Sequence, residues 1–199
     1  MTVTSSSGAR PRGAARREAL LDAVLRIVAE VGADAVTHRR VAETAGLPLA
    51  STTYYFDSKE HLLTAALEWA AERDMARLHV FLSQVPEAIT DPLGLAVEAI
   101  LDPLGDNDQG CRASLLATYA LMLEAARRPA LREINRRWSE AYLDALSRLL
   151  ELAGSEDPRS DAEILLAAAD GLLVEQLASD GTGDVRPQLR RLAAALVKP

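Results

Sequence analysis

The sequence predicts an all-α protein, and three observations lead to this prediction. Ala, Leu, Glu and Arg are abundant among the 199 residues, and these side chains lose little rotamer freedom in a helix. β-branched residues other than Val are few. Apolar residues recur at helical spacing, and breaks containing Gly or Pro separate the segments that carry them. We therefore expect about nine helices joined by short connections.

The first helix is expected over residues 12–31. Its apolar side chains recur at i, i+3, i+4 and i+7 and so form one stripe, and Gly32 follows as the C-cap. The stripe consists of Leu20, Leu21, Val24, Ile27, Val28 and Val31. A helix with one apolar stripe buries that stripe in a core.

The second helix is short, beginning after Thr37 and ending near Gly46. The Thr37 hydroxyl can accept a hydrogen bond from a backbone N–H in the first turn. Val36 and Val41 have the spacing of a hydrophobic staple across this cap. We therefore expect a capped helix of about two turns here.

Two further helices are expected before residue 86. Leu47 and Pro48 break the chain, and a short helix follows over residues 49–55. Asp57 and Glu60 have the spacing of a capping box, which predicts the start of a longer helix that runs to about Val85.

Pro and Gly residues divide the rest of the chain into five more expected helices. These lie over residues 91–104, 108–127, 129–153, 159–179 and 184–197.

The charge is distributed unevenly along the chain. Residues 1–60 hold eight basic and seven acidic side chains, a net +1, whereas residues 61–199 hold 14 and 22, a net −8. The first 17 residues carry four Arg and no acid, and residues 1–11 are expected to form a disordered basic arm. This asymmetry indicates that the N-terminal part faces a polyanion.

Several classes of protein and site are not expected. No apolar stretch of 18 residues and no apolar segment of a signal peptide is present, so we expect a cytoplasmic protein without a membrane partner. The single Cys111 and the dispersed His38, His61 and His79 predict neither a disulfide framework nor a metal site, and no cofactor. Nucleophile-elbow, phosphate-loop and zinc-protease motifs are lacking, so an enzyme is not expected.

The second and third expected helices, joined by the turn at Gly46, have the form of a helix-turn-helix unit. Arg39 and Arg40 fall in the first turn of one helix, and Lys59 falls in the first turn of the next long helix. Positive charge at a helix start opposes the helix dipole, which indicates that an external anion such as DNA phosphate binds there.

The residues of this unit resemble the DNA-binding region of the TetR family of transcriptional regulators. Residues 37–46 read THRRVAETAG, and residues 56–63 read FDSKEHLL. The resemblance implies a three-helix DNA-binding domain over 12–57, joined by a long helix to a helical ligand-binding and dimerisation domain over 58–199. The residues expected to meet double-stranded DNA are Thr37, Arg39, Arg40, Ala50, Ser51, Thr53, Tyr54, Tyr55 and Lys59.

The expected recognition helix has an unusual composition for base reading. It begins with Pro48 and Leu49, and Thr53 stands where the family commonly has Tyr. No Arg, Lys, Asn or Gln lies between Leu49 and Tyr55, so bidentate pairing to guanine or adenine is not available from this helix. Hydroxyl groups, thymine methyl contacts and DNA shape are expected to supply modest base discrimination.

The resemblance also implies a small-molecule effector and a homodimer. The expected ligand-binding residues are Trp69, Cys111, Tyr119, Met122, Trp138, Tyr142 and Gln176, with Glu124 and Asn135 as further polar contacts. Residues 162–178 are apolar nearly all round, so that helix is buried on more than one side. The expected dimer interface consists of Leu165, Ala169, Leu172, Leu173, Leu189, Leu192 and Leu196, and the alternative is that these side chains form the core of a single chain.

The most favoured function is a ligand-responsive repressor that binds a pseudo-palindromic operator as a dimer. Three alternatives remain at this point: an activator, a repressor without a ligand, and a helical protein-interaction module without DNA binding. The apolar start of the recognition helix and the overall acidity of the chain favour the last of these alternatives.

Overall fold

The computed structural model of the protein describes residues 12–85, 88–101, 109–179 and 183–197, with the backbone alone described for residues 12 and 109–111. Within these ranges it contains nine α-helices, one short 3₁₀-helix and no strand, which confirms the all-α prediction. The helices are α1 (Arg12–Val31), η1 (Ala33–Ala35), α2 (His38–Ala45), α3 (Leu49–Tyr55), α4 (Lys59–Ser83), α5 (Pro92–Leu101), α6 (Gln109–Glu124), α7 (Pro129–Leu152), α8 (Pro158–Ala178) and α9 (Arg186–Leu196). Each expected helix is found, η1 was not predicted, and the expected arm over 1–11 lies outside the described residues.

The predicted signals around α2 are present in the structure. Gly32 adopts φ 85° after α1, a conformation that glycine reaches without a steric cost. The Thr37 hydroxyl accepts a hydrogen bond from the Arg40 N–H at 3.2 Å, and the staple residues Val36 and Val41 are fully buried. The entry into α2 is therefore fixed by one cap and one apolar contact.

The start of α4 differs from the prediction. Its N-cap is Ser58, whose hydroxyl accepts from the His61 N–H at 3.1 Å, and not Asp57. The His61 ring, in place of a Glu60 side chain, reaches back and accepts from the Asp57 N–H at 3.3 Å. The capping-box prediction was wrong because Ser58 has the extended backbone of a cap, φ −154° and ψ 164°, and its hydroxyl stands next to the first free N–H groups.

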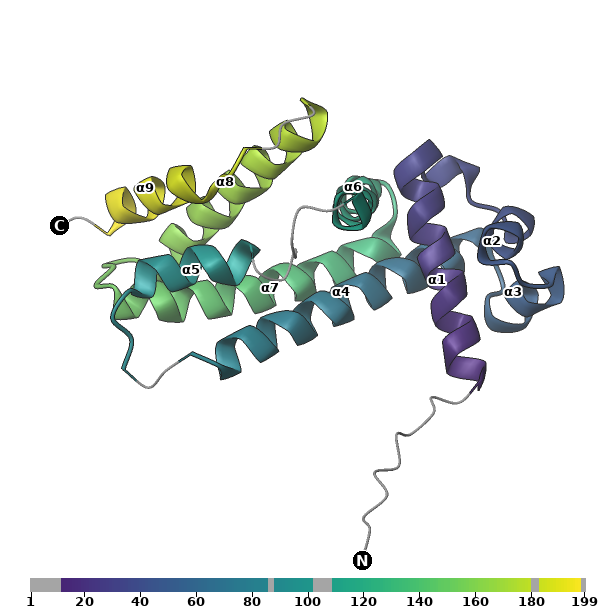
Figure 1. Ribbon diagram of the computed structural model, residues 1–199, viewed down its shortest axis with the longest axis horizontal. Coiled ribbons are helices and arrows are strands. Elements are labelled where there is room, and N and C mark those ends of the chain that lie inside the picture. The colour runs from purple at the N-terminus through teal and green to yellow at the C-terminus, as the bar shows by residue number, and fades with distance from the viewer. Residues whose placement is uncertain (1–11, 86–87, 102–108, 180–182, 198–199) are drawn as a thin grey trace, which may run out of the picture.

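The long helices α4 and α7 lie side by side and connect the two ends of the molecule (Figure 1). At one end, α1, α2 and α3 pack with the first half of α4 around a core that includes Leu20, Phe56 and Leu63. At the other end, α5 and α8 pack on α7, and α9 packs on α5 and α8, around a second core that includes Ile100 and Leu146. No helix in the described ranges is long and apolar enough to cross a membrane.

Helix α6 packs against both cores. Ala117 and Leu121 on one face of α6, and Ala125 directly after it, are buried in the first core, and α6 packs against α1. Leu115 and Tyr119 on another face pack on the second core. A shift of α6 is therefore felt by α1, because closely packed cores transmit displacements.

The helices expected to form a dimer interface bury most of the expected residues inside the single chain. Leu165, Ala169, Leu173 and Leu189 belong to the second core and are at most 7% exposed. Leu172, Leu192 and Leu196 are half-buried against the same core. The four buried residues fit the single-chain alternative, which periodicity did not distinguish because α8 is apolar on both its inner and outer faces. An interface role for Leu172, Leu192 and Leu196 stays a prediction.

A different stripe of α8 is exposed. Ile164 and Val174 are each 46% exposed, and Ala167, Gly171 and Ala178 are exposed between and beyond them. Their spacing alternates between three and four residues, so the five residues lie on one face of the helix.

Candidate nucleic-acid interface and internal cavity

The turn between α2 and α3 is built by Gly46 and closed by backbone hydrogen bonds. Gly46 lies in the left-handed region, with φ 65° and ψ 30°, and the Leu47 N–H donates to the Ala42 carbonyl at 2.9 Å. This is the arrangement in which a glycine after the last turn satisfies the free carbonyls of a helix. The two helices are therefore held in a fixed relation by local geometry.

Thr52 anchors α3 on α2. Its side chain is fully buried, and its hydroxyl donates to the Leu49 carbonyl at 2.8 Å and lies 3.5 Å from the His38 carbonyl. Phe56, at the end of α3, is also buried in the first core. The inner face of α3 is thus fully used in packing, which leaves the opposite face for a partner.

The opposite face of α3 is exposed and carries most of the DNA-binding residues that were expected on this helix. Tyr54 is 80% exposed, Leu49 is 50% exposed, and Ala50 and Thr53 are exposed beside them. Ser51 is half-buried. A short helix with one anchored face and one exposed face is able to enter a DNA major groove.

Tyr55 differs from the other expected DNA-binding residues. Its ring is half-buried against the first core, and its hydroxyl donates to the Gly13 carbonyl at 3.1 Å. Tyr55 therefore ties the end of α3 to the first turn of α1, and this use of its hydroxyl was not predicted.

Two of the expected phosphate-binding cations have partners within the chain. Arg39 Nε lies 2.9 Å from Glu43 Oε1, and Lys59 Nζ donates to the Asp34 carbonyl at 2.8 Å. Arg40 is exposed in the first turn of α2. The Arg39–Glu43 pair is exposed, and exposed pairs are weak, so a phosphate can compete for Arg39.

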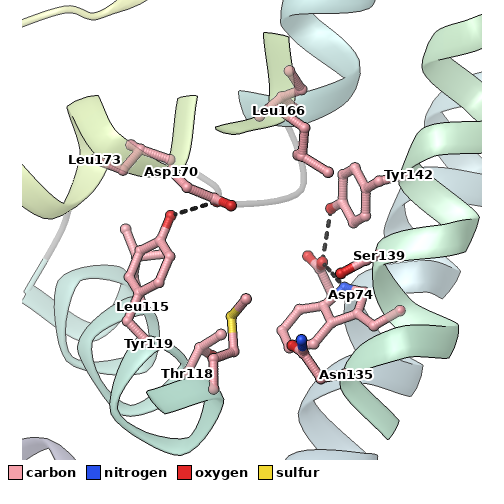
Figure 2. A pocket seen from close by; sticks show the side chains of 13 residues that line it. Asp74, Leu115, Thr118, Tyr119, Asn135, Ser139, Tyr142, Leu166, Asp170 and Leu173 are labelled. Carbon is pink, nitrogen blue, oxygen red and sulfur yellow. Dashed lines mark hydrogen bonds between the residues drawn. The ribbon is translucent and has the colours of Figure 1, made fainter. Parts of the chain in front are cut away.

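A cavity lies between α4, α5, α6, α7 and α8, away from the helix-turn-helix unit. Its empty volume is about 520 Å³ when the space at its mouth is included. Figure 2 shows most of the side chains around it. They are Asp74, Ile100, Leu115, Thr118, Tyr119, Met122, Asn135, Trp138, Ser139, Tyr142, Leu166, Asp170 and Leu173. A largely apolar wall with a few polar groups is what a small-molecule site requires.

Two carboxylates stand on opposite sides of this cavity (Figure 2). Asp74 Oδ2 accepts from the Trp138 Nε1–H at 2.8 Å and from the Tyr142 hydroxyl at 2.7 Å. Asp170 Oδ1 accepts from the Tyr119 hydroxyl at 3.0 Å. Burial raises the pKa of both carboxyl groups, and these hydrogen bonds offset part of the rise.

The two tyrosines remain neutral donors. Burial, together with the neighbouring carboxylates, raises the pKa of Tyr142 and of Tyr119 well above the usual range. Each tyrosine is affected by both Asp74 and Asp170, which indicates that the two carboxylates act on the same enclosed space. Asn135 adds a buried Oδ1 that accepts no hydrogen bond in the described part of the chain.

Four of the seven expected ligand-binding residues line this cavity: Tyr119, Met122, Trp138 and Tyr142. Trp69 does not; it packs on the first core, with the Arg73 guanidinium 4.4 Å from its ring centre. Gln176 donates to the Gly183 carbonyl near the end of α8. The side chain of Cys111 lies outside the described residues.

Comparison with known proteins places these features in one family. The model of a family described as "Bacterial regulatory proteins, tetR family" matches residues 20–78. A second model, described as "Tetracyclin repressor-like, C-terminal domain", matches residues 91–199. The chain belongs to the TetR family of transcriptional regulators. It is therefore a helix-turn-helix transcriptional regulator and not an enzyme, as the sequence predicted.

Individual relatives agree with this assignment. The transcriptional regulator BetI of Rhizobium meliloti is 30% identical over 164 residues, which cover 81% of this chain and 77% of BetI. A transcriptional regulator from Rhodococcus sp. Rha1 has a similar structure, with 25% identity, a TM-score of 0.79 and coverage of 90% and 95% of the two chains. The multidrug binding protein EbrR, solved in complex with ethidium, has 30% identity, a TM-score of 0.67 and coverage of 92% and 99%.

The sequence alone did not predict that Asp74 and Asp170 line the cavity. Asp170 left a signal, because it is the one acid in the otherwise apolar run from residue 164 to residue 174. Asp74 left none, because it lies among other charged residues of α4 between Arg73 and Arg77. Only the packing of α4 against α7 brings Asp74 next to Trp138 and Tyr142.

Proposed function

We propose that this regulator is a repressor that binds a pseudo-palindromic operator as a homodimer and releases it when a small molecule enters the cavity. The observation that carries the proposal is the position of α6, which lines the cavity with one face and packs on α1 with another. Because the relatives are bacterial regulators and bacterial operators lie on cytoplasmic DNA, its place of action is the cytoplasm.

The exposed face of α3 is the reading surface in this proposal. Ala50, Ser51, Thr53 and Tyr54 meet the base edges, while Thr37, Arg39, Arg40 and Lys59 meet phosphates at the starts of α2 and α4. This division follows from chemistry: hydroxyl and apolar groups contact thymine methyls and base edges, and cations next to free helix N–H groups bind phosphate. Tyr55 supports the surface from behind through its bond to Gly13.

The exposed stripe of α8 supports a dimer. Ile164, Ala167, Gly171, Val174 and Ala178 repeat at the three- and four-residue spacing by which two helices pack along their length. Pairing of α8 with its two-fold mate, next to α9, gives a four-helix interface. A symmetric dimer then presents two copies of α3 to successive major grooves, roughly 34–36 Å apart.

The response to a ligand follows from the packing of α6. A molecule between Tyr119 on α6 and Trp138 on α7 favours one position of α6, and the buried contacts of Leu121 pass that preference to α1. Release of DNA requires that the ligand bind more tightly to the arrangement in which the two copies of α3 no longer match the grooves. The complex of EbrR with ethidium supports the use of a cavity in this fold by a small molecule.

Selection from fragmented genomic DNA tests the proposal directly. Purified protein is incubated with fragments at about 50 and about 200 mM salt, because phosphate-driven background falls steeply with salt and specific capture persists. Recovery of one inverted repeat supports a dimeric regulator. Recovery of no fragment above background favours the protein-interaction alternative.

A matched pair of variants identifies the reading surface in the same assay. Tyr54→Ala removes a side chain that is 80% exposed on α3, so the fold is retained while capture of the repeat is lost. Leu152→Ala, an exposed change at the far end of α7, leaves capture unchanged. A reporter gene placed behind the recovered repeat distinguishes a repressor from an activator. A repressor lowers transcription of the reporter, and an activator raises it.

A further inference from the structure

The charge of the cavity points to the chemical class of its ligand. Two carboxylates and three aromatic rings belong to the side chains that line this space. None of its thirteen lining residues, all of them in the described part of the chain, is basic. The few ionisable acids of this largely apolar wall are therefore not balanced by a basic side chain in it, and three aromatic rings lie beside them.

No cationic side chain in the cavity wall balances the charges of the two carboxylates. Asp74 is held by Trp138 and Tyr142, and Asp170 is held by Tyr119, all of which are neutral donors. Such bonds spread a negative charge but do not neutralise it, and a buried charge without a counter-charge is costly. Arg77 on the exposed side of α4 acts on Asp74 but is not one of the lining residues.

We propose that the effector is a small organic cation, an amine or quaternary ammonium, held between Asp74 and Asp170 and against the rings of Trp138, Tyr119 and Tyr142. This inference rests on the proposed function, because it takes the cavity to be the effector site. A cation supplies a counter-charge inside the cavity, where the wall has none, and is attracted by the faces of aromatic rings.

Other classes of ligand fit less well. An anion is repelled by both carboxylates, and no basic lining residue compensates. A neutral apolar molecule displaces water from the carboxylates and leaves them without a counter-charge. A metal ion lacks a ligand set, since no group of three or more His, Cys, Asp or Glu side chains in the described residues could hold one.

The size of the cavity limits the ligand. The cavity volume of about 520 Å³ includes the space at its mouth, so the enclosed part is smaller and a large cation must displace side chains. Met122 is the natural side chain to move, because its unbranched thioether adapts to irregular shapes.

Three probes of one shape test the charge preference. Benzylammonium, benzyl alcohol and benzoate differ chiefly in charge, and their affinities for the full-length protein are measured by calorimetry at about pH 7. We expect benzylammonium to bind at least tenfold more tightly than benzyl alcohol, about 1.4 kcal/mol, and benzoate not to bind. Equal binding of the first two probes, or no binding of benzylammonium, overturns the proposal.

Variants locate the preference in the cavity. Asp74→Asn and Asp170→Asn keep the acceptor oxygen for their tyrosines, and each lowers benzylammonium affinity about tenfold while leaving benzyl alcohol within about twofold. Asp144→Asn makes the same change on the exposed side of α7, outside the cavity, and leaves all affinities unchanged. If a cavity variant fails to fold, the comparison of three probes on the wild-type protein still decides.

The proposed DNA-binding function is tested independently of the proposed class of ligand. Capture of an inverted repeat is measured without any probe and does not depend on the charge of the ligand. A protein that captures the repeat but binds benzyl alcohol as tightly as benzylammonium keeps the proposed function and excludes a cationic effector.

Discussion

Replacement of Arg39 by Ala separates DNA affinity from fold stability. The Arg39 side chain is 83% exposed, and its partner Glu43 is exposed one turn later on the same helix. An exposed pair at this spacing contributes little to the stability of the fold, and Ala is itself a good helix former. The urea unfolding midpoint of Arg39→Ala is therefore expected to be nearly the same as that of the wild-type protein.

The effect on DNA binding is larger and depends on salt. Each phosphate contact contributes about 0.9 to the slope of log K against log salt concentration, and a dimer loses two contacts, so the slope flattens by about 1.8. Between about 50 and 200 mM salt, the wild-type affinity then falls about twelvefold more than that of the variant. The variant is weaker at low salt, and the difference narrows as salt increases.

Fluorescence anisotropy on the selected repeat measures this slope at several salt concentrations. Arg136→Ala is the matched control, because Arg136 is also exposed, also pairs with a glutamate on its own helix, and lies on α7 away from α3. An Arg39→Ala slope equal to that of the control would refute the phosphate contact and, with it, the orientation of α2 on the duplex.

Two other predictions concern the fold. Gly46→Ala places a side chain at φ 65°, where no atom lies within 4 Å of the added Cβ, so backbone strain alone lowers the free energy of unfolding, by about 1–2 kcal/mol. Gly46→Asn is expected to lower it less, because Asn adopts the left-handed conformation more readily. Equal urea midpoints for the wild type and these two variants would contradict the prediction. For the cavity, burial raises the pKa of Asp170 above its ordinary 3.8, so the folded chain holds this proton more tightly than the unfolded chain. The free energy of unfolding of the wild type, relative to that of Asp170→Asn, is then expected to fall as pH rises from about 4 toward 7. Tyr119, which donates to Asp170, and Asp74 across the cavity are the groups that share this space with the Asp170 carboxyl. Urea unfolding across this interval measures the difference, and a rise would show that the fold stabilises the charged carboxylate.

Local signals determined the helices and the family. Apolar spacing, the Thr37 cap and the break at Gly46 predicted α1, α2 and α3, because each of these depends only on neighbours in the sequence. The motif over residues 37–63 was sufficient to identify the TetR family. The misplaced cap at Asp57 shows the limit of such signals, since two adjacent residues can both cap and only backbone geometry chooses between them.

Tertiary structure alone decided which side chains meet. The apolar helix α8 has two faces that look alike in the sequence, and packing buried Leu165 and Ala169 while leaving Ile164 and Val174 exposed. Asp74 lies 64 residues from Trp138 and 68 from Tyr142, and no pattern in the chain predicts their contact. The sequence by itself thus determined the helices and the family, through interactions within a few residues. The inner and outer faces of α8 and the acidic character of the cavity arise from contacts between distant helices, which only the packed chain defines.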